Sequence, residues 1–306
     1  MPRASLVVSV RRMIVICLVV LLALPGLMVD STVAAQITCE DVSAPAASPA
    51  TPEAASPAAG IVVPFPEDGG TVDVFAAASL VDAFAEIESD LEAANPNLDV
   101  VVVTAGSQAL VTQLMEGAEA DVLATANTRT MGDAVAGGLI DGESATFTGN
   151  RLVIVAPSDN PAGIASLDDL AGDDLNLVLA GADVPVGTYS RNVLCAYDAS
   201  GTAPDGFIKA VDANVVSEEE DVRTVLAKVQ LGEADAGIVY ASDAVASELA
   251  GTPLTVIEFP AGLDATAEYP IAAVAGGDID LAQAFISYVL SADGQATLEA
   301  YGFAQP

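Results

Sequence analysis

Short apolar runs alternate with amphipathic segments from about residue 71 to the end of the chain. Val72–Phe75 has the composition of a buried strand. The segment after it carries apolar residues at the spacing of one helix face, namely Leu80, Phe84, Ile87 and Leu91. Ser79 with Asp82 resembles a capping box at the start of this helix, and Asn95-Pro96 ends it. The chain is therefore expected to enter its fold as a strand followed by an amphipathic helix.

The same alternation predicts the elements that follow. Strands are expected at 98–104, 121–125, 152–156, 175–180, 236–240, 254–259 and 271–275. Helices are expected at 107–117, 131–135, 166–169, 187–197, 219–231, 281–290 and 294–301. Repeated strand-helix-strand order predicts an α/β fold with parallel strands. Met115–Val122 and Gln230–Gly237 share one plan of helix end, glycine, acidic turn and strand, which suggests two similar lobes.

The N-terminus has the pattern of a secretory signal. Three of the nine basic residues, Arg3, Arg11 and Arg12, precede the apolar run Met13–Val29, and the small residues Val33-Ala34-Ala35 follow. We expect residues 1–35 to be a signal peptide that is cut after Ala35. Retention as a membrane anchor is disfavoured because Pro25-Gly26 interrupts the run, whereas a span needs ~20 apolar residues.

Residues 36–70 are predicted to be a disordered tether before the folded part. Their middle, residues 43–60, is a Pro/Ala/Ser/Thr-rich stretch with almost nothing to bury. The roughly 235 residues that follow are enough for a substantial core in one or two domains.

Acidic residues dominate the composition. The chain has 43 acidic and 9 basic residues and a formal net charge of −34. Removal of residues 1–35 takes away three Arg and Asp30, so 42 acidic and 6 basic residues remain and the net charge becomes −36. Nucleic acids and anionic lipid surfaces are therefore poor partners.

Enzyme chemistry is disfavoured by the residues that are missing. The chain has no His, which excludes Ser-His triads and imidazole metal sites, and it has no Gly-Lys-Ser/Thr phosphate loop. Acidic pairs such as Asp168-Asp169 lie in polar turns and are expected by chance in so acidic a chain. We expect neither an enzyme nor a resident cofactor.

Two cysteines remain once Cys17 leaves with the signal peptide. Cys39 and Cys195 can form a disulfide in an oxidising compartment, and two free thiols are an equal alternative. A lipid-modified Cys39 is disfavoured because Gln36-Ile37-Thr38 lacks the small residues expected before such a cysteine.

Five segments place small, hydroxyl-bearing or backbone-donating residues where a strand gives way to a helix. A helix start carries unpaired N–H groups and a partial positive charge, so several converging starts can bind an anion without Lys or Arg. The five segments are Ala76-Ala77-Ala78-Ser79-Leu80, Ala105-Gly106-Ser107, Val184–Tyr189, Glu220–Arg223 and Gly237–Tyr240. Together they predict a cradle for an oxyanion.

In these segments the chain resembles the molybdate-binding proteins of bacterial ABC importers, which have the type II periplasmic-binding-protein fold. The resemblance covers about residues 72–303, and its motifs follow in family order. They are Val74–Leu80, Ala118–Val122, Asn150-Arg151-Leu152-Val153, Glu220–Arg223, Gly237–Ala244 and Glu268–Ala272.

The resemblance implies two similar three-layer α/β lobes joined by hinge strands. We assign residues 71–153 plus 270–306 to lobe I and residues 154–269 to lobe II. It also implies a bare tetrahedral oxyanion, held between the lobes by two serines, two backbone amides and one tyrosine hydroxyl. These donors map onto Ser79, Ser107, Val186, Val222 and Tyr240. No metal is expected beyond the molybdenum or tungsten of the anion.

The resemblance further implies a function in transport. We expect an exported monomer, periplasmic or on the outer face of the cytoplasmic membrane, that delivers molybdate or tungstate to the permease and ATPase subunits of an importer. A cradle made of donors alone should reject hydrogen phosphate, whose proton needs an acceptor, and should discriminate against sulfate by cavity size. A sulfate or carboxylate receptor with the same fold, and an acidic surface module that binds Ca²⁺, are the alternatives.

Each candidate residue also has a purely structural interpretation. Ser79 and Ser107 can be helix N-caps, Tyr240 a half-buried core residue, and Val222 a core residue of an amphipathic helix. Arg151 and Arg223 are interpreted as surface ion-pairing residues rather than anion ligands, Arg223 because of the acidic run Glu218–Asp221 beside it.

Overall fold

The structure is a computed structural model that describes residues 36–39 and 63–306. The predicted signal peptide and most of the predicted tether lie outside these residues. All the described residues belong to one compact unit. None of the helices in the described part of the chain is both long and apolar enough to cross a membrane.

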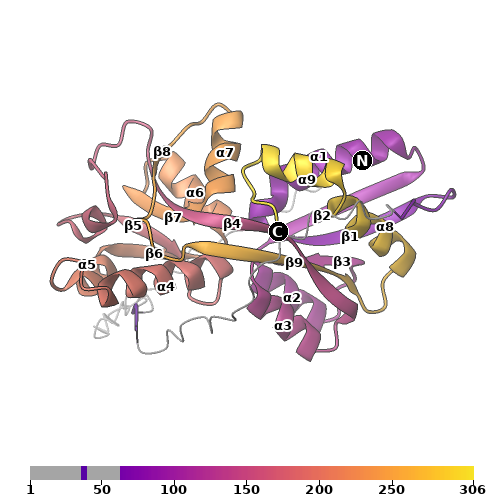
Figure 1. Ribbon diagram of the computed structural model, residues 1–306, viewed down its shortest axis with the longest axis horizontal. Helices are drawn as coiled ribbons and strands as arrows, with labels where there is room; N and C mark the ends of the chain where they lie inside the picture. Colours follow the sequence, from indigo (N-terminus) through magenta and orange to yellow (C-terminus); the bar gives the residue numbers. More distant parts are fainter. Residues whose placement is uncertain (1–35, 40–62) are drawn as a thin grey trace, which may run out of the picture. The chain divides into compact units, whose positions relative to one another are not determined.

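Nine strands of the described chain are joined in the order β2-β1-β3-β9-β4-β7-β5-β6, with β8 paired to β4 (Figure 1). The strands are β1 Gly70–Ala77, β2 Leu98–Ala105, β3 Val122–Ala124, β4 Ile140–Ala156, β5 Leu177–Ala180, β6 Val215–Glu219, β7 Ala236–Tyr240, β8 Thr255–Ile257 and β9 Thr266–Val274. The helices are η1 Ala78–Leu80, α1 Val81–Ala94, α2 Ser107–Met115, α3 Thr128–Ala136, η2 Leu167–Ala171, α4 Pro185–Ala199, α5 Phe207–Asn214, α6 Val222–Gln230, α7 Ala241–Leu249, α8 Ile279–Val289 and α9 Ala292–Ala300.

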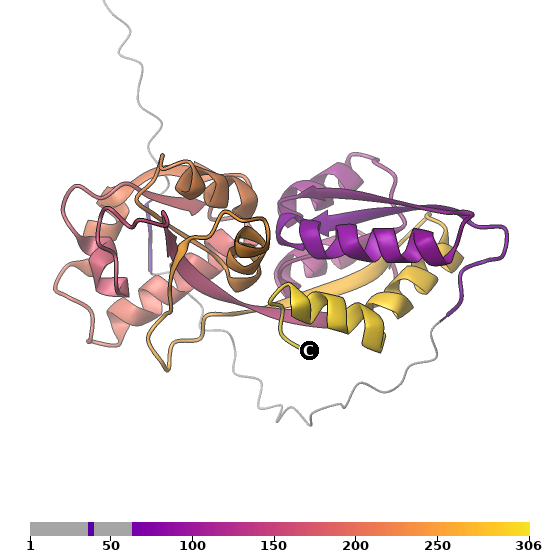
Figure 2. The same cartoon turned by 90° about the horizontal axis from the view of Figure 1, so that it is seen from above.

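The first lobe is built around β1. This strand pairs in parallel with β2 and β3, and β3 pairs antiparallel with β9. Helices α1, α8 and α9 lie on one side of these strands, and α2 and α3 lie on the other (Figures 1 and 2). The predicted apolar face of α1 is buried as expected, since Leu80, Phe84, Ile87 and Leu91 are all at most 2% exposed. Phe84 packs against Phe147 and Phe285 in the core of this lobe.

The second lobe is built around β5. This strand pairs in parallel with β6 and β7, and β7 pairs antiparallel with β4. Helices α4, α5, α6 and α7 surround these strands (Figure 1). Each lobe is thus a small sheet covered by helices, as the alternating pattern predicts.

Two long strands run from one lobe into the other. Strand β4 pairs with β9 from Ile140 to Arg151 and with β7 from Leu152 onward, so its two halves belong to different groups of strands. Strand β9 pairs with β4 along its whole length, from Thr266 to Val274, and its residues Ile271–Ala273 also pair with β3. The predicted fold of two α/β lobes joined by hinge strands is confirmed. The exact residue boundaries of the lobes stay a prediction.

Several predicted elements differ from the observed ones. The helix expected from Glu219 begins at Val222, because Glu219 ends strand β6 and Asp221 caps the helix. The strand expected at 152–156 begins at Ile140, and helices α5 and α7 were not predicted. The capping box at Ser79 was wrong, since η1 and α1 have no side-chain cap there. The one at Ser166 and Asp169 is present.

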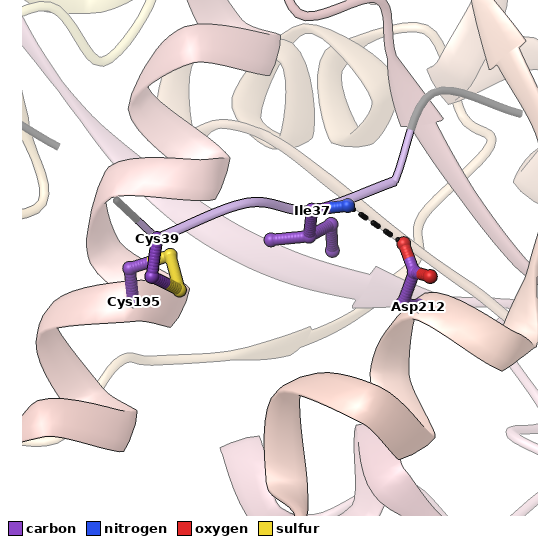
Figure 3. The surroundings of a disulfide bond; sticks show 4 residues. All are labelled: Ile37, Cys39, Cys195 and Asp212. Carbon is purple, nitrogen blue, oxygen red and sulfur yellow. Dashed lines mark hydrogen bonds between the residues drawn. A yellow bond between two sulfur atoms is a disulfide. The ribbon is translucent and has the colours of Figure 1, made fainter. Parts of the chain in front are cut away.

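The segment before the predicted low-complexity stretch is attached to the second lobe. Cys39 forms a disulfide with Cys195 of α4, which is the pairing weighed against free thiols in the sequence (Figure 3). The Ile37 N–H donates to Asp212 Oδ1 of α5 at 2.8 Å, and the Ile37 side chain is buried. On the other side of the undescribed residues, Val63 N donates to Ser287 Oγ of α8 at 2.9 Å.

Candidate functional site

A small cavity is lined by all five residues that the resemblance pointed to. Its lining consists of Ala77, Ala78, Ser79, Gly106, Ser107, Ala126, Val184, Pro185, Val186, Asp221, Val222 and Tyr240. These residues come from the ends of β1 and β7, from η1, from the loop after β3 and from the starts of α2, α4 and α6, so both lobes contribute. Their role as ligands stays a prediction, but their convergence at one cavity is a structural fact.

Ser79 lies in η1, directly after β1, and is 3% exposed. Its hydroxyl is 2.9 Å from the hydroxyl of Tyr269 on the hinge strand β9. No side-chain cap bond is formed at either η1 or α1. The N-cap interpretation of Ser79 is therefore wrong, and its hydroxyl belongs to a buried polar pair beside the cavity.

Ser107 is the first residue of α2, and Gly106 is the N-cap. Its Oγ accepts a hydrogen bond of 3.0 Å from the N–H of Ala126, so the hydroxyl proton is left for another acceptor. The N-cap interpretation is wrong here as well. A Cβ on Gly106 would lie 2.4 Å from the carbonyl oxygen of Glu220, which explains why glycine is needed where the two lobes approach.

Val186 lies in the first turn of α4, where N–H groups have no acceptor within the helix. The helix start is held by the buried Arg191, whose Nη1 donates to the carbonyls of Ala180 at 2.8 Å and Gly187 at 3.0 Å. Gly187 permits this packing, since a Cβ there would lie 1.9 Å from the Gly181 oxygen. Val186 itself is 1% exposed and lines the cavity.

Val222 is the first residue of α6 and is likewise buried. The N-cap Asp221 accepts from the N–H of Thr224 at 2.9 Å through Oδ1 and from the Thr224 hydroxyl at 3.2 Å through Oδ2. Asp221 also lines the cavity; it lies in the predicted segment Glu220–Arg223 but was not among the five predicted ligands. The N–H of Val222 belongs to the first turn of α6, where N–H groups have no acceptor within the helix.

Tyr240 ends β7 and is 1% exposed, so the half-buried interpretation of this residue is wrong. Its hydroxyl is a buried oxygen without a hydrogen-bond partner among the described residues. Burial raises the pKa of this hydroxyl well above its usual value, and it therefore carries its proton at neutral pH. A buried donor without a hydrogen bond lowers the stability of the fold unless a ligand accepts that hydrogen bond.

The two arginines behave differently from each other. Arg151 pairs with Glu258 on the surface, with both side chains more than half exposed, as predicted. Arg223 does not pair with the neighbouring acidic run but with Asp82 of the first lobe, and its Nε lies 3.2 Å from Oδ1 of the buried Asp243. Arg223 is therefore an ion-pairing residue, as predicted, but its partner Asp82 lies in the other lobe.

Sequence reasoning missed a second layer of residues behind the cavity. Asn150, Tyr269 and Asp243 are all at most 3% exposed, and each makes a hydrogen bond close to Ser79 or Tyr240. Tyr269 and Asn150 were quoted only as parts of motifs, and a buried tyrosine before a proline is not by itself a signal. No group of His, Cys, Asp and Glu within the described residues could hold a metal ion.

The comparisons with known proteins agree on the kind of protein. Residues 72–304 match the model of the bacterial extracellular solute-binding proteins. The chain is 37% identical over 282 residues to the molybdate-binding protein ModA of Mycobacterium tuberculosis, covering 92% of this chain and 97% of the relative.

Two solved structures have the same fold. The periplasmic molybdate-binding protein of Azotobacter vinelandii superposes with a TM-score of 0.66 at 17% identity, over 77% of this chain and 99% of that one. The sulfate-binding protein SubI of M. tuberculosis superposes with a TM-score of 0.68 at 19% identity, over 76% of this chain and 86% of that one. The chain therefore belongs to the family of bacterial extracellular solute-binding proteins and has the type II periplasmic-binding-protein fold.

Proposed function

We propose that this protein captures molybdate or tungstate between its two lobes and delivers it to an ABC importer. The observation that carries the proposal is the unpaired, fully buried hydroxyl of Tyr240, which lines one small cavity with the hydroxyls of Ser79 and Ser107. The N–H groups of Val186 and Val222 complete five neutral donors. Relatives that carry the name molybdate-binding protein support the choice of anion.

The donor set favours an oxyanion that has lost all its protons. Each hydrogen bond to a charged group contributes about 1.5–3 kcal/mol, so five such bonds can support micromolar or tighter binding after ordering costs. Hydrogen phosphate carries a proton that needs an acceptor. Asp221 also lines the cavity, and its carboxylate keeps free lone pairs beside the two hydrogen bonds from Thr224, so a titration with phosphate must test whether hydrogen phosphate is excluded.

The proposed transport role implies a location and partner proteins. The protein would be exported, would act as a monomer in the periplasm or outside the cytoplasmic membrane, and would meet the permease and ATPase subunits of the importer. Lobe I would comprise residues 71–153 and 270–306, and lobe II residues 154–269. The family of extracellular solute-binding proteins supports both the location and the non-enzymatic role.

Sulfate is the second candidate ligand. A sulfate-binding protein has the same fold. Sulfate has the charge of molybdate but a smaller radius, so a cavity shaped for molybdate would hold it with longer hydrogen bonds. Competition between the two anions at equal concentrations separates these ligands.

The test is calorimetric titration of dialysed protein with molybdate, tungstate and sulfate. We expect one-to-one binding of the first two, little heat from sulfate, and roughly tenfold to hundredfold weaker binding by Ser79→Ala. Ser89→Ala, on the exposed side of α1, is the matched control and should bind like the unchanged protein. Absence of heat with molybdate and tungstate at saturating concentration would refute the proposal.

A further inference from the structure

Tyr269 links the candidate site to a buried set of hydrogen-bonded side chains. Its hydroxyl is 2.9 Å from Ser79 Oγ and 3.4 Å from Asn150 Nδ2. Tyr269 is 0% exposed, and Ser79 and Asn150 are each 3% exposed. The three residues come from β9, η1 and β4, so the hinge strands reach the cavity through this chain of contacts.

The orientation of the Asn150 amide is fixed by the backbone. The N–H of Arg151 donates to Asn150 Oδ1 at 2.9 Å, which identifies the oxygen end of the amide. The nitrogen end therefore points to Tyr269, and it also donates to Ser242 Oγ at 2.8 Å. An amide nitrogen only donates hydrogen bonds, so the Tyr269 oxygen must be the acceptor in the contact with Asn150.

Either hydroxyl of the Ser79–Tyr269 pair can be the donor, and Tyr269 has one proton to place. Burial raises the pKa of Tyr269 above its usual value, so its hydroxyl keeps a single proton to donate. Since its oxygen accepts from Asn150, this proton is available for Ser79 Oγ. When Tyr269 donates to Ser79 Oγ, the proton of Ser79 is left to point at the cavity. The Ser107 hydroxyl proton is also available to a ligand, because Ser107 Oγ accepts from the N–H of Ala126.

We propose that Asn150 and Tyr269 are positioning residues that fix Ser79 as a hydrogen-bond donor toward the bound anion. Their role is to determine specificity. A serine that can only donate a hydrogen bond favours an oxyanion without protons and disfavours one that carries a proton. This inference rests on the proposed function and names the residues that enforce its selectivity. Neither residue contacts the anion in this scheme.

The sharpest test is Asn150→Asp, which should reverse the direction of the hydrogen bonds from residue 150 through Tyr269 to Ser79. The new carboxylate can still accept from the N–H of Arg151, but it now accepts from the Tyr269 hydroxyl as well. Tyr269 must then accept from Ser79, which turns a lone pair of Ser79 toward the cavity. A second variant, Tyr269→Phe, removes the donor to Ser79 without adding a charge, and it keeps the test available if Asn150→Asp fails to fold.

The measurement is the ratio of the affinities for molybdate and hydrogen phosphate at pH 8. Both are dianions there, so the ratio cancels the general repulsion from the new carboxylate and reports the direction of the Ser79 proton. We expect Asn150→Asp to lower the affinity for molybdate by roughly tenfold or more and to raise the relative affinity for hydrogen phosphate. Tyr269→Phe should shift the ratio in the same direction by a smaller factor.

Ser242→Ala is the matched control, because it removes the other hydrogen bond of Asn150 Nδ2 and leaves the route to Ser79 intact. Its ratio should stay within about twofold of that of the unchanged protein. Equal loss of both anions in Asn150→Asp and Tyr269→Phe, or an unchanged ratio, would overturn the inference while leaving the proposed function standing. If the unchanged protein binds neither molybdate nor tungstate, the proposed function fails first and the inference with it.

Discussion

Arg223 of α6 and Asp82 of α1 form an ion pair that joins the second lobe to the first beside the candidate site. The Nε of Arg223 lies 3.4 Å from the carbonyl of Ala78, which precedes Ser79. A second contact between the lobes runs from Gln108 Nε2 to the carbonyl of Glu220 at 3.0 Å. The lobes are thus held together near the cavity by polar contacts from segments that also supply predicted ligands.

Asp82→Asn should weaken molybdate binding by roughly twofold to fivefold, because a partly exposed ion pair contributes about 0.2–1 kcal/mol. The loss should appear mainly as faster dissociation, since the pair forms only when the lobes meet. Stopped-flow displacement of bound molybdate measures this rate. Glu258→Gln removes the exposed pair with Arg151 and is the control. Equal dissociation rates in both variants would show that the pair does not hold the lobes closed.

The predictable part of the fold is the part with strong periodicity. The face of α1 and the capping box at Ser166 are local patterns, and the structure agrees with both. The first half of β4 was missed because residues 140–151 are polar in composition and are stabilised by pairing with β9, which lies more than 100 residues away. Long-range pairing leaves no local signal.

The candidate site was predictable only where a motif carried it. The five lining residues follow strand-to-helix junctions, and their order along the chain made the resemblance visible. The supporting layer of Asn150, Tyr269 and Asp243 is defined by burial and by hydrogen-bond direction. Neither property can be read from the order of residues, and the same is true of the contact between Arg223 and Asp82 across the lobes.

Gly187→Ala should reduce both stability and binding. The added Cβ would lie 1.9 Å from the Gly181 oxygen and 2.5 Å from the Ala180 oxygen, so the start of α4 would have to move away from the cavity. We expect a loss of about 1–3 kcal/mol in the free energy of unfolding and at least tenfold weaker molybdate binding. Urea unfolding and calorimetry measure the two effects.

The control for Gly187→Ala is Gly132→Ala, in the exposed interior of α3. A Cβ there meets no atom within 4 Å, so the change should be neutral or stabilising by up to about 1 kcal/mol. If the two alanine variants had the same stability and affinity, close packing at the start of α4 would not explain the glycine.

Loss of the disulfide should lower stability and leave the anion stoichiometry unchanged. Cys39 and Cys195 are separated by 156 residues, and bonds that close long loops typically contribute about 2–5 kcal/mol. Cys39→Ala combined with Cys195→Ala should therefore melt at a lower temperature. Dithiothreitol should lower the melting temperature of the unchanged protein and should not affect the double variant. A double variant as stable as the unchanged protein would contradict this expectation.

Deprotonation of Asp243 should lower the free energy of unfolding as pH rises from about 4 to 6. Burial raises its pKa from the usual value of 3.8 to about 6, in spite of the opposing charge of Arg223. Because the folded state holds this proton more tightly, the stabilisation is fully present below about pH 4 and is lost as pH rises through about 6. In Asp243→Asn this contribution is absent. The melting temperature of the unchanged protein minus that of the variant should decrease between pH 4 and 6 and level off above; a constant difference would show that Asp243 does not titrate in this range.

Salt should speed the association of the anion. Residues 36–306 carry a net charge of −36, and the proposed site offers neutral donors, so a dianion meets long-range repulsion before it reaches short-range hydrogen bonds. Raising NaCl from about 20 to 300 mM shortens the screening length severalfold and should raise the association rate constant severalfold.

The chain has no Trp, so tyrosine fluorescence in stopped flow follows binding, with Tyr240 in the cavity wall as a reporter. An uncharged osmolyte at equal osmolarity is the control, because it does not screen charge. A rate constant that falls with salt would mean that a local positive potential at the cavity outweighs the charge of the whole protein, and the view of a site built from neutral donors would have to be given up.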